Sequence, residues 1–381
     1  MNPADVSGLE LSRRFYHEAV GPVLQTGWPD LPYSAALLGK GSEVLGFDDR
    51  MSRDHDWGPR LILFLSDRDR REQGEALRDE LARRLPVTFL GYPTHFTEPD
   101  PDGDGTRRMH PGVGGPVRHG VEITDLETYL DGYLGIRSVQ GIGAADWLTL
   151  PEQKLLSLTA GEVFHDGLAD PADGEPRAGR GVLARMRSRL DYYPRDVWLF
   201  QLAAAWARIG QEEHLVGRAG HVGDEVGAAL IAARLVRDLM RLCFLMERTY
   251  APYPKWLGAA FRRLQCGPAL DPVLREVLAA RDWESRESHL VVAYQSVAAM
   301  HNELGITNPL SDRVARFFER PFRVMAFHGF SDALLGRVDA GFLTDALRRS
   351  PIGGVDLVSD SPGVLEEPGF RPALRRLYGS R

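Results

Sequence analysis

Lysine is scarce in this chain of 381 residues. Three of its 46 basic residues are lysines and the other 43 are arginines. An ammonium group and a guanidinium group are not interchangeable, because one is a compact point charge and the other a flat fork of donors. The three exceptions, Lys40, Lys154 and Lys255, are therefore candidates for roles that arginine would fill less well.

Cysteine and long apolar runs are also scarce. Cys243 and Cys266 are the two cysteines, which is too few for a cysteine-based zinc site and fits a reducing compartment. No uninterrupted apolar stretch approaches the roughly 20 residues that span a bilayer. The first residues lack a basic segment followed by an apolar one, so no secretory signal is expected. We expect a cytoplasmic protein with no membrane partner.

The overall charge is acidic, at −7, while 43% of the residues are apolar and 26% are charged. This mixture is typical of globular proteins, and the length suits two or three domains of roughly 100–200 residues. The acidic balance argues against a surface built mainly to neutralise a long nucleic acid, although it leaves room for a local basic patch.

The first third of the chain mixes helical and strand patterns. Apolar residues recur at helical spacing over 8–25, and short apolar runs bounded by Gly, Pro and Asp indicate strands. The expected strands are 35–38, 61–65, 87–90 and 121–123, and the further expected helices are 69–85 and 126–134. We predict a mixed α/β N-terminal domain over residues 1–140.

Helical periodicity dominates after about residue 140, without convincing strands. The expected helices are 146–159, 196–213, 222–247, 254–265, 272–280, 285–304, 311–328 and 342–349. The Gly-, Pro- and Asp-rich segment 166–181 suits a linker, and 351–372 is expected to be irregular. The predicted fold is therefore α+β, with a C-terminal all-helical domain over residues 141–381.

One stretch carries chemistry. Gly41-Ser42 follows a short strand, and after eleven intervening residues Asp54 and Asp56 precede an apolar run. Residues two apart in a strand point to one face, so we expect the two carboxylates side by side at the start of the strand. Adjacent like charges are costly unless a cation lies between them, and oxygen ligands suit Mg²⁺. A Gly-Ser turn exposes backbone amides and a hydroxyl to a phosphate.

This pattern resembles the nucleotidyltransferase superfamily that includes the beta-type DNA polymerases and the antibiotic nucleotidyltransferases. Its signature is an apolar residue, Gly-Ser, a spacer of about nine to thirteen residues, and Asp-any-Asp; Gly41-Ser42 and Asp54-His55-Asp56 match it. The sequence also resembles a bacterial family named as domain of unknown function 4037. This resemblance lies in Gly46-Phe47-Asp48-Asp49 and in Ser52-Arg53-Asp54-His55-Asp56-Trp57-Gly58-Pro59-Arg60. One departure is His55, where the superfamily has an apolar residue.

The resemblance implies a third carboxylate on a neighbouring strand, for which Glu122 is the candidate and Asp125 the alternative. With Asp54 and Asp56 it would hold two Mg²⁺ ions, one activating the attacking hydroxyl and one holding the nucleoside triphosphate. An ordinary solvent-facing strand residue is the other interpretation of Glu122.

Two further groups of residues are candidates for nucleotide binding. Lys40, Gly41 and Ser42 would contact the triphosphate, although Lys40 also fits a solvated strand end. Tyr253 and Lys255 lie in a segment dense in aromatic residues, and the resemblance implies that the helical domain adds to the nucleotide or acceptor pocket. A buried corner between helices explains that segment nearly as well. Lys154, at an expected helix start, suits a structural role.

The resulting hypothesis is a Mg²⁺-dependent nucleotidyltransferase that moves a nucleoside monophosphate from ATP or another nucleoside triphosphate to a hydroxyl. The acceptor would be a small molecule or a protein. Two alternatives stay open: a transferase directed at RNA, such as tRNA ends, and a non-catalytic nucleotide-binding or antitoxin-like partner protein. The net charge disfavours the first, and the pair Asp54 and Asp56 disfavours the second. The sequence does not fix the oligomeric state.

Overall fold

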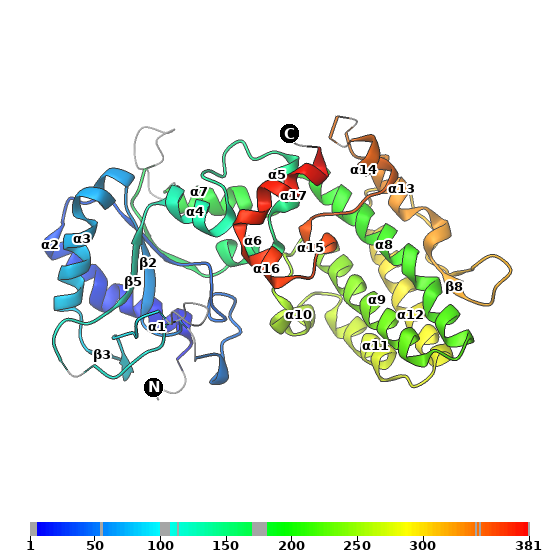
Figure 1. Cartoon of the computed structure of the whole chain (residues 1–381), viewed down its shortest axis with the longest axis horizontal. Helices are drawn as coiled ribbons and strands as arrows, with labels where there is room; N and C mark the ends of the chain where they lie inside the picture. The colour runs from blue at the N-terminus through cyan, green and yellow to red at the C-terminus, as the bar shows by residue number, and fades with distance from the viewer. Residues whose placement is uncertain are drawn as a thin grey trace. The chain divides into compact units, whose positions relative to one another are not determined.

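The computed structural model describes residues 6–53, 56–99, 107–112, 114–169, 181–339, 341–342 and 344–379 (Figure 1). The chain divides into two compact units. The first comprises Met1–Gly141 with Lys154–Asp191, and the second comprises Ile142–Gln153 with Tyr192–Arg381. Across the described ranges, no helix combines the length and apolar character that crossing a membrane requires.

A mixed four-stranded sheet organises the first unit, in the order β5-β2-β1-β6. Strands β1 (Ser34–Leu37), β2 (Arg60–Phe64) and β5 (Gly120–Thr124) match the expected strands, whereas β6 (Glu162–Asp166) was not expected. Strand β1 pairs antiparallel with β2 and β6, and β2 pairs parallel with β5. The mixed sheet confirms the predicted α/β character of the N-terminal region.

Helices cover one face of this sheet. They are α1 (Gly8–Phe15), the π-helical turn η2 (Tyr16–Val20), α2 (Gly21–Gly27) and α3 (Asp67–Arg84). Leu61 and Leu63 of β2 pack into a core with residues such as Leu11 and Leu77. Since side chains alternate along a strand, Ile62 between them points to the opposite face. That opposite face carries the candidate site.

The remaining elements of the first unit are short. They are η3 (Met51–Arg53), β3 (Thr88–Phe89), β4 (Tyr92–Pro93), α4 (Leu126–Leu134), most of α6 (Glu152–Thr159) and α7 (Val182–Leu190). Asp125 caps α4 by accepting a hydrogen bond from the backbone N–H of Thr128, and Gly135 ends it in the left-handed conformation, with φ 68°.

Helices build most of the second unit. They are α5 (Ala144–Thr149), α8 (Arg195–His221), α9 (Glu225–Met246), α10 (Pro254–Phe261), α11 (Gly267–Ala279) and α12 (Trp283–Glu303). The helices α8 and α9 pack along one another, joined by a tight turn in which Gly223 has φ 84°. Their buried faces are mainly apolar, as the periodicity predicts, and include the polar residues Gln201 and Glu213 of α8 and Asp238 and Arg241 of α9.

Shorter elements complete the second unit. They are β7 (Ala315–Arg316), β8 (Arg323–Val324), η4 (Ala326–His328), α13 (Phe330–Leu335), α14 (Asp345–Arg349), α15 (Val355–Val358), α16 (Pro362–Glu366), η5 (Pro368–Phe370), α17 (Arg371–Arg375) and η6 (Arg376–Tyr378).

Three expectations about the C-terminal part are wrong. The expected absence of strands after residue 140 fails because β6 completes the sheet of the first unit beside β1, so 154–191 belong to that unit. The expected helix 311–328 is a hairpin of β7 and β8, in which Pro321 lies between the strands and lacks an N–H for a helix. The expected irregular tail contains short helices.

Candidate functional site

A glycine-rich turn, Gly39-Lys40-Gly41-Ser42, follows the end of β1. Gly39 and Gly41 have φ angles of 81° and 130°, which residues other than glycine rarely adopt. A Cβ atom on Gly41 would lie 2.5 Å from Arg60 Nη2 and 2.6 Å from Glu43 Oε2. Both glycines are therefore required by backbone conformation and by close packing.

A buried ion pair supports this turn. Arg60, the first residue of β2, donates hydrogen bonds of 2.9 and 2.5 Å to Glu43 Oε1, and one of 2.5 Å to the carbonyl oxygen of Lys40. Burial acts to lower the pKa of Arg60, but Glu43 and then Asp56 raise it overall, so the guanidinium stays charged.

Asp56 lies ahead of β2 and not within it. The strand starts at Arg60, and Asp56 has φ 46°, which is not a strand conformation. The expectation that Asp56 lies at the start of a strand beside Asp54 is therefore wrong for Asp56. Its N–H donates to the carbonyl oxygen of Arg107 at 2.9 Å, and its Oδ1 accepts from Arg107 N at 3.2 Å. Asp54 and His55 lie outside the described residues.

Glu122 is on β5, opposite Ile62 of the parallel strand β2. Its neighbour Val121 points into the core, so Glu122 projects from the other face of the sheet. Desolvation by the surrounding protein raises the pKa of Glu122, although the Arg107 and Arg60 guanidinium groups act in the opposite direction. The neutral form of this carboxyl group is thus more favourable than in water, and a nearby cation would favour the charged form.

Asp56 and Glu122 line one cleft of about 370 Å³ in the first unit. Its other lining residues are Leu38, Lys40, Arg60, Ile62, Arg107, Thr124, Thr128, Tyr129, Gly132 and Tyr133. Of the predicted phosphate-binding residues, the lining includes Lys40, which is exposed, whereas Ser42 is buried with 8% of its surface exposed.

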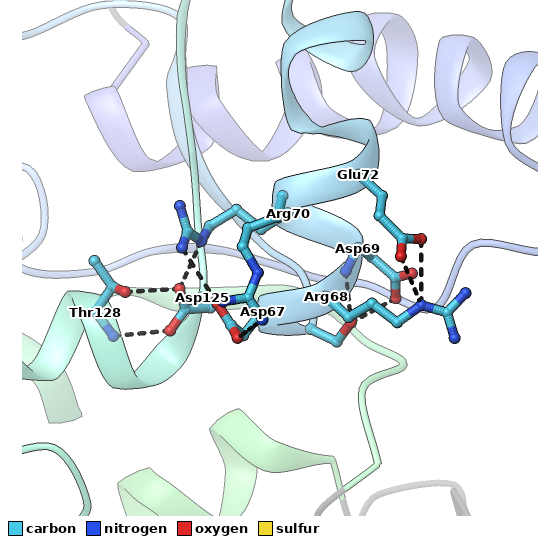
Figure 2. A network of polar contacts seen from close by, with 9 residues as sticks. Asp67, Arg68, Asp69, Arg70, Glu72, Asp125 and Thr128 are labelled. Atoms are coloured by element: carbon cyan, nitrogen blue, oxygen red, sulfur yellow. Dashed lines mark hydrogen bonds and ion pairs between the residues drawn. The ribbon is translucent and has the colours of Figure 1, made fainter.

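Asp125, the alternative third carboxylate, has a different role (Figure 2). It accepts hydrogen bonds from the N–H and hydroxyl of Thr128 at 2.8 and 2.7 Å, and its Oδ2 lies 2.7 Å from Arg70 Nε. Burial acts to raise its pKa, but these hydrogen bonds and Arg70 lower it overall. Of the two candidates, Glu122 is the one that lines the cleft.

Two arginines and two tyrosines of the cleft were not assigned a role from the sequence. Arg60 and Arg107 add positive charge beside the two carboxylates, and Tyr129 and Tyr133 of α4 stack with ring centroids 5.7 Å apart. The spacing of the two tyrosines, four residues apart on an expected helix, was a usable signal. Arg107 follows a stretch of sequence rich in Pro, Gly and Asp without apolar periodicity, so nothing in the sequence indicated its position.

The three lysines have different surroundings. Lys154 is buried, donates a hydrogen bond of 2.8 Å to the carbonyl oxygen of Tyr133 and lies 5.0 Å from its ring, as a structural role predicts. Lys255, in the second unit, is exposed and lies 4.8 Å from the Trp256 ring. Tyr253 is the N-cap residue of α10 in that unit. A role for Tyr253 and Lys255 at the nucleotide stays a prediction.

The oxygen-donor side chains of the cleft show whether it suits a metal ion. Within the described residues, no three Asp, Glu, His or Cys side chains gather in a metal-binding group. Asp56 and Glu122 contribute two carboxylates to the cleft, and Asp54 lies outside the described residues. Carboxylate oxygens fit Mg²⁺, which takes one or two carboxylates and fills its other positions with water and phosphate oxygens.

Comparison with known proteins bears out one part of the resemblance seen in the sequence, the one to the family of unknown function. Residues 147–257 match the family described as Domain of unknown function (DUF4037). A solved structure, a nucleotidyltransferase-like protein from Exiguobacterium sibiricum 255-15, is similar over 90% of this chain and 92% of its own, with 12% identity and a TM-score of 0.31. No curated protein matches the chain.

Proposed function

We propose that the first unit is the catalytic part of a nucleotidyltransferase that transfers a nucleoside monophosphate from a nucleoside triphosphate to a hydroxyl group. One observation carries the proposal: Lys40, Arg60 and Arg107 line the same cleft as the carboxylates Asp56 and Glu122. Cations beside a glycine-rich turn suit a triphosphate, and paired carboxylates suit the metal ions that accompany it.

The charge balance of the cleft supports this ligand. Three cationic side chains face two anionic ones, so the lining has a small net positive charge, and a triphosphate with Mg²⁺ adds charge of both signs. A volume of about 370 Å³ lies within the usual range for small-molecule sites. ATP is the nucleotide to test first.

Asp56 and Glu122, together with Asp54, are the proposed holders of two Mg²⁺ ions. Bound Mg²⁺ supplies charge neutralisation at the phosphates and activation of the attacking hydroxyl. Lys40 and Arg107 are the proposed contacts of the triphosphate oxygens, and Arg60 keeps the glycine-rich turn in shape through Glu43 and the Lys40 carbonyl.

The proposed transfer forms one bond and breaks one. The acceptor hydroxyl oxygen attacks the α-phosphorus, the bond from that phosphorus to the bridging oxygen breaks, and pyrophosphate leaves with the electron pair. The hydroxyl proton is released to water. We propose a small-molecule acceptor, with a protein hydroxyl as the second choice, because the acidic chain does not favour a long polyanion.

Binding of nucleotide by the purified full-length protein tests the site. We expect ATP to bind in a Mg²⁺-dependent manner in equilibrium dialysis, and Asp56→Asn and Glu122→Gln each to weaken that binding about tenfold or more. Glu127→Gln is the matched control, since this carboxylate is exposed on α4 and does not line the cleft. Equal Mg²⁺-dependent binding by all four proteins contradicts the assignment.

Turnover distinguishes an enzyme from a binding protein. Pyrophosphate release is measured with each of the four nucleoside triphosphates and with pools of small molecules, proteins and RNA as acceptors. We expect release that depends on the small-molecule or protein pool. Tight nucleotide binding without release in any pool favours the non-catalytic alternative, and label entering RNA favours the RNA-directed one.

A further inference from the structure

The hairpin of β7 and β8 in the second unit displays aromatic side chains at its surface. Phe317 and Phe318 lie in its turn, and Phe327 lies in η4 just after β8. Phe318 is 65% exposed and Phe327 is 47% exposed. Single exposed apolar residues are ordinary, but a contiguous cluster of them marks an interaction site.

The rings in this cluster form an ordered stack. The His214 ring of α8 stacks on Phe317 with centroids 4.2 Å apart and planes at 20°, and Phe317 stacks on Phe327 at 5.8 Å and 9°. Phe318 stands edge-on to both phenylalanines, with interplanar angles of 66° and 71°. The three nearly parallel rings are therefore His214, Phe317 and Phe327, and the last of them is 47% exposed.

The backbone of Phe318 adds an independent observation. Its φ is 56°, a left-handed conformation that is unfavourable for a bulky residue and ordinary for glycine or asparagine. The turn is closed by a hydrogen bond of 3.1 Å from Arg320 N to the carbonyl oxygen of Phe317. An exposed aromatic residue held in a strained turn is typical of a functional position.

The hairpin is anchored firmly to the helices beneath it. Phe322 is 4% exposed and meets Trp283 edge-on, with ring centroids 5.9 Å apart. The Glu213 carboxylate accepts hydrogen bonds of 2.8 and 2.7 Å from the N–H groups of Met325 and Ala326. The aromatic cluster is thus displayed on a preorganised base, which lowers the entropy cost of binding.

Positive charge surrounds the rings. Arg313, Arg316 and Arg320 are exposed, and the Arg320 guanidinium lies 5.5 Å from the centroid of Phe317. Arg313 is 3.7 Å from Asp312, whereas Arg316 and Arg320 form no ion pair with any part of the chain that the structure describes. Glu319 is the other acidic residue of the hairpin. The surface is locally basic although the chain carries a net charge of −7.

We propose that the β7–β8 hairpin and His214 form a binding surface for single-stranded nucleic acid, with a base stacked on Phe327 and phosphates bound by Arg316 and Arg320. Single-strand binding surfaces combine aromatic rings, which accept any base, with cations along the backbone. The parallel stack favours a flat base over lipid chains, which would not need ordered rings. This proposal does not depend on the proposed function of the cleft.

Fluorescence anisotropy with the full-length protein and labelled 12-nucleotide RNA and DNA single strands tests the surface. We expect binding that weakens with salt and is weaker still for an abasic strand of the same length and for a duplex. Phe327→Ala, Phe318→Gly and Arg320→Ala should each weaken binding about fivefold or more. Binding of either strand in this manner supports the proposal, and the tighter of the two shows which sugar the surface prefers.

Matched controls separate binding from folding. Phe370→Ala removes another exposed phenylalanine of the same unit, at 50% exposure, and Arg281→Ala removes another exposed arginine, so both should retain wild-type affinity. Phe318→Gly is informative because glycine suits φ 56°, so this variant should fold normally and still bind less well. No binding, equal binding to the abasic strand and to all variants, or binding to anionic phosphatidylserine vesicles alone would overturn the proposal.

Discussion

Arg60 Nε donates a hydrogen bond of 2.9 Å to Oε1 of Glu43, and so joins the start of β2 to the residue that follows the Gly41-Ser42 turn. The Arg60 side chain is 14% exposed and the Glu43 side chain 3%. Arg60 also donates a hydrogen bond to the carbonyl oxygen of Lys40, within the glycine-rich turn. Hydrogen bonds from Arg60 therefore connect the glycine-rich turn to strand β2 of the sheet.

We expect Arg60→Ala to lower the free energy of unfolding by about 3–5 kcal/mol, because it leaves the Glu43 carboxylate buried without its partner. Urea denaturation of the wild type and the variant measures this loss. Replacing both residues, Arg60→Met with Glu43→Leu, should recover part of it. Nucleotide affinity should stay low in the double variant, since the turn loses its support.

The control for this pair is Arg14→Ala, which breaks an ion pair with Glu18 on the exposed face of the first helix. Exposed ion pairs contribute little because water and salt screen them. The unfolding midpoint should hardly move. A loss for Arg60→Ala no larger than that for Arg14→Ala would contradict the role of the buried pair.

The positive-φ glycines at positions 41 and 46 should tolerate alanine unequally. Gly41→Ala should cost more than Gly46→Ala, because a Cβ at Gly41 collides with Arg60 and Glu43, and because alanine adopts the φ of 130° at Gly41 less readily than the φ of 66° at Gly46, where a Cβ meets open space. The strain at φ 66° in Gly46→Ala should amount to about 1 kcal/mol. Thermal unfolding of both variants measures the difference in stability. Equal losses would contradict the collision expected for a Cβ atom at position 41.

Asp125→Ala should destabilise the first unit by about 1 kcal/mol through loss of the α4 cap, and should also weaken nucleotide binding. The second effect follows because α4 carries Tyr129 and Tyr133 into the cleft. Asp282→Ala removes a comparable cap from α12 in the second unit and should leave nucleotide affinity unchanged. Equal effects of the two variants on nucleotide affinity would contradict the role of α4 in the nucleotide site.

Glu213 should make stability depend on pH. Burial raises its pKa from 4.5 to about 7, against the hydrogen bonds from Met325 and Ala326. The folded state then binds the proton more tightly than the unfolded chain, so this contribution is present at low pH and is lost as pH rises from about 4.5 to about 7. The loss amounts to about 3 kcal/mol.

Unfolding of the wild type and Glu213→Gln at pH 5 and pH 8 tests this sign. The variant should lose less stability than the wild type between the two values. Glu276→Gln, on an exposed face of α11, is the control and should follow the wild type. A steeper loss in Glu213→Gln than in the wild type would reverse the assignment.

Much of the first unit could be predicted because its elements have clear local signals. Apolar runs predict β1, β2 and β5, and helical periodicity over 69–85 predicts most of α3, which the structure begins at Asp67 after the N-cap residue Ser66. Strand β6 was missed because residues 162–166 are largely polar, and its stability depends on pairing with a strand far away in sequence. The β7–β8 hairpin was missed for another reason: its strands pair locally, but its backbone is held by side chains of α8 and α12, which lie far from it in the sequence.

The sequence by itself determined the glycine-rich turn, the carboxylates Asp54, Asp56 and Glu122 as candidates, and the resemblance to nucleotidyltransferases. Only the tertiary structure decided that Asp56 lies before the strand, that Asp125 caps a helix, and that Arg60 and Arg107 share the cleft with Glu122. Residue types and spacings specify local conformation, whereas charges from β2, β5 and the segment at Arg107 meet only once the sheet has paired. The physical reason is that long-range pairing, and not local preference, brings these groups together.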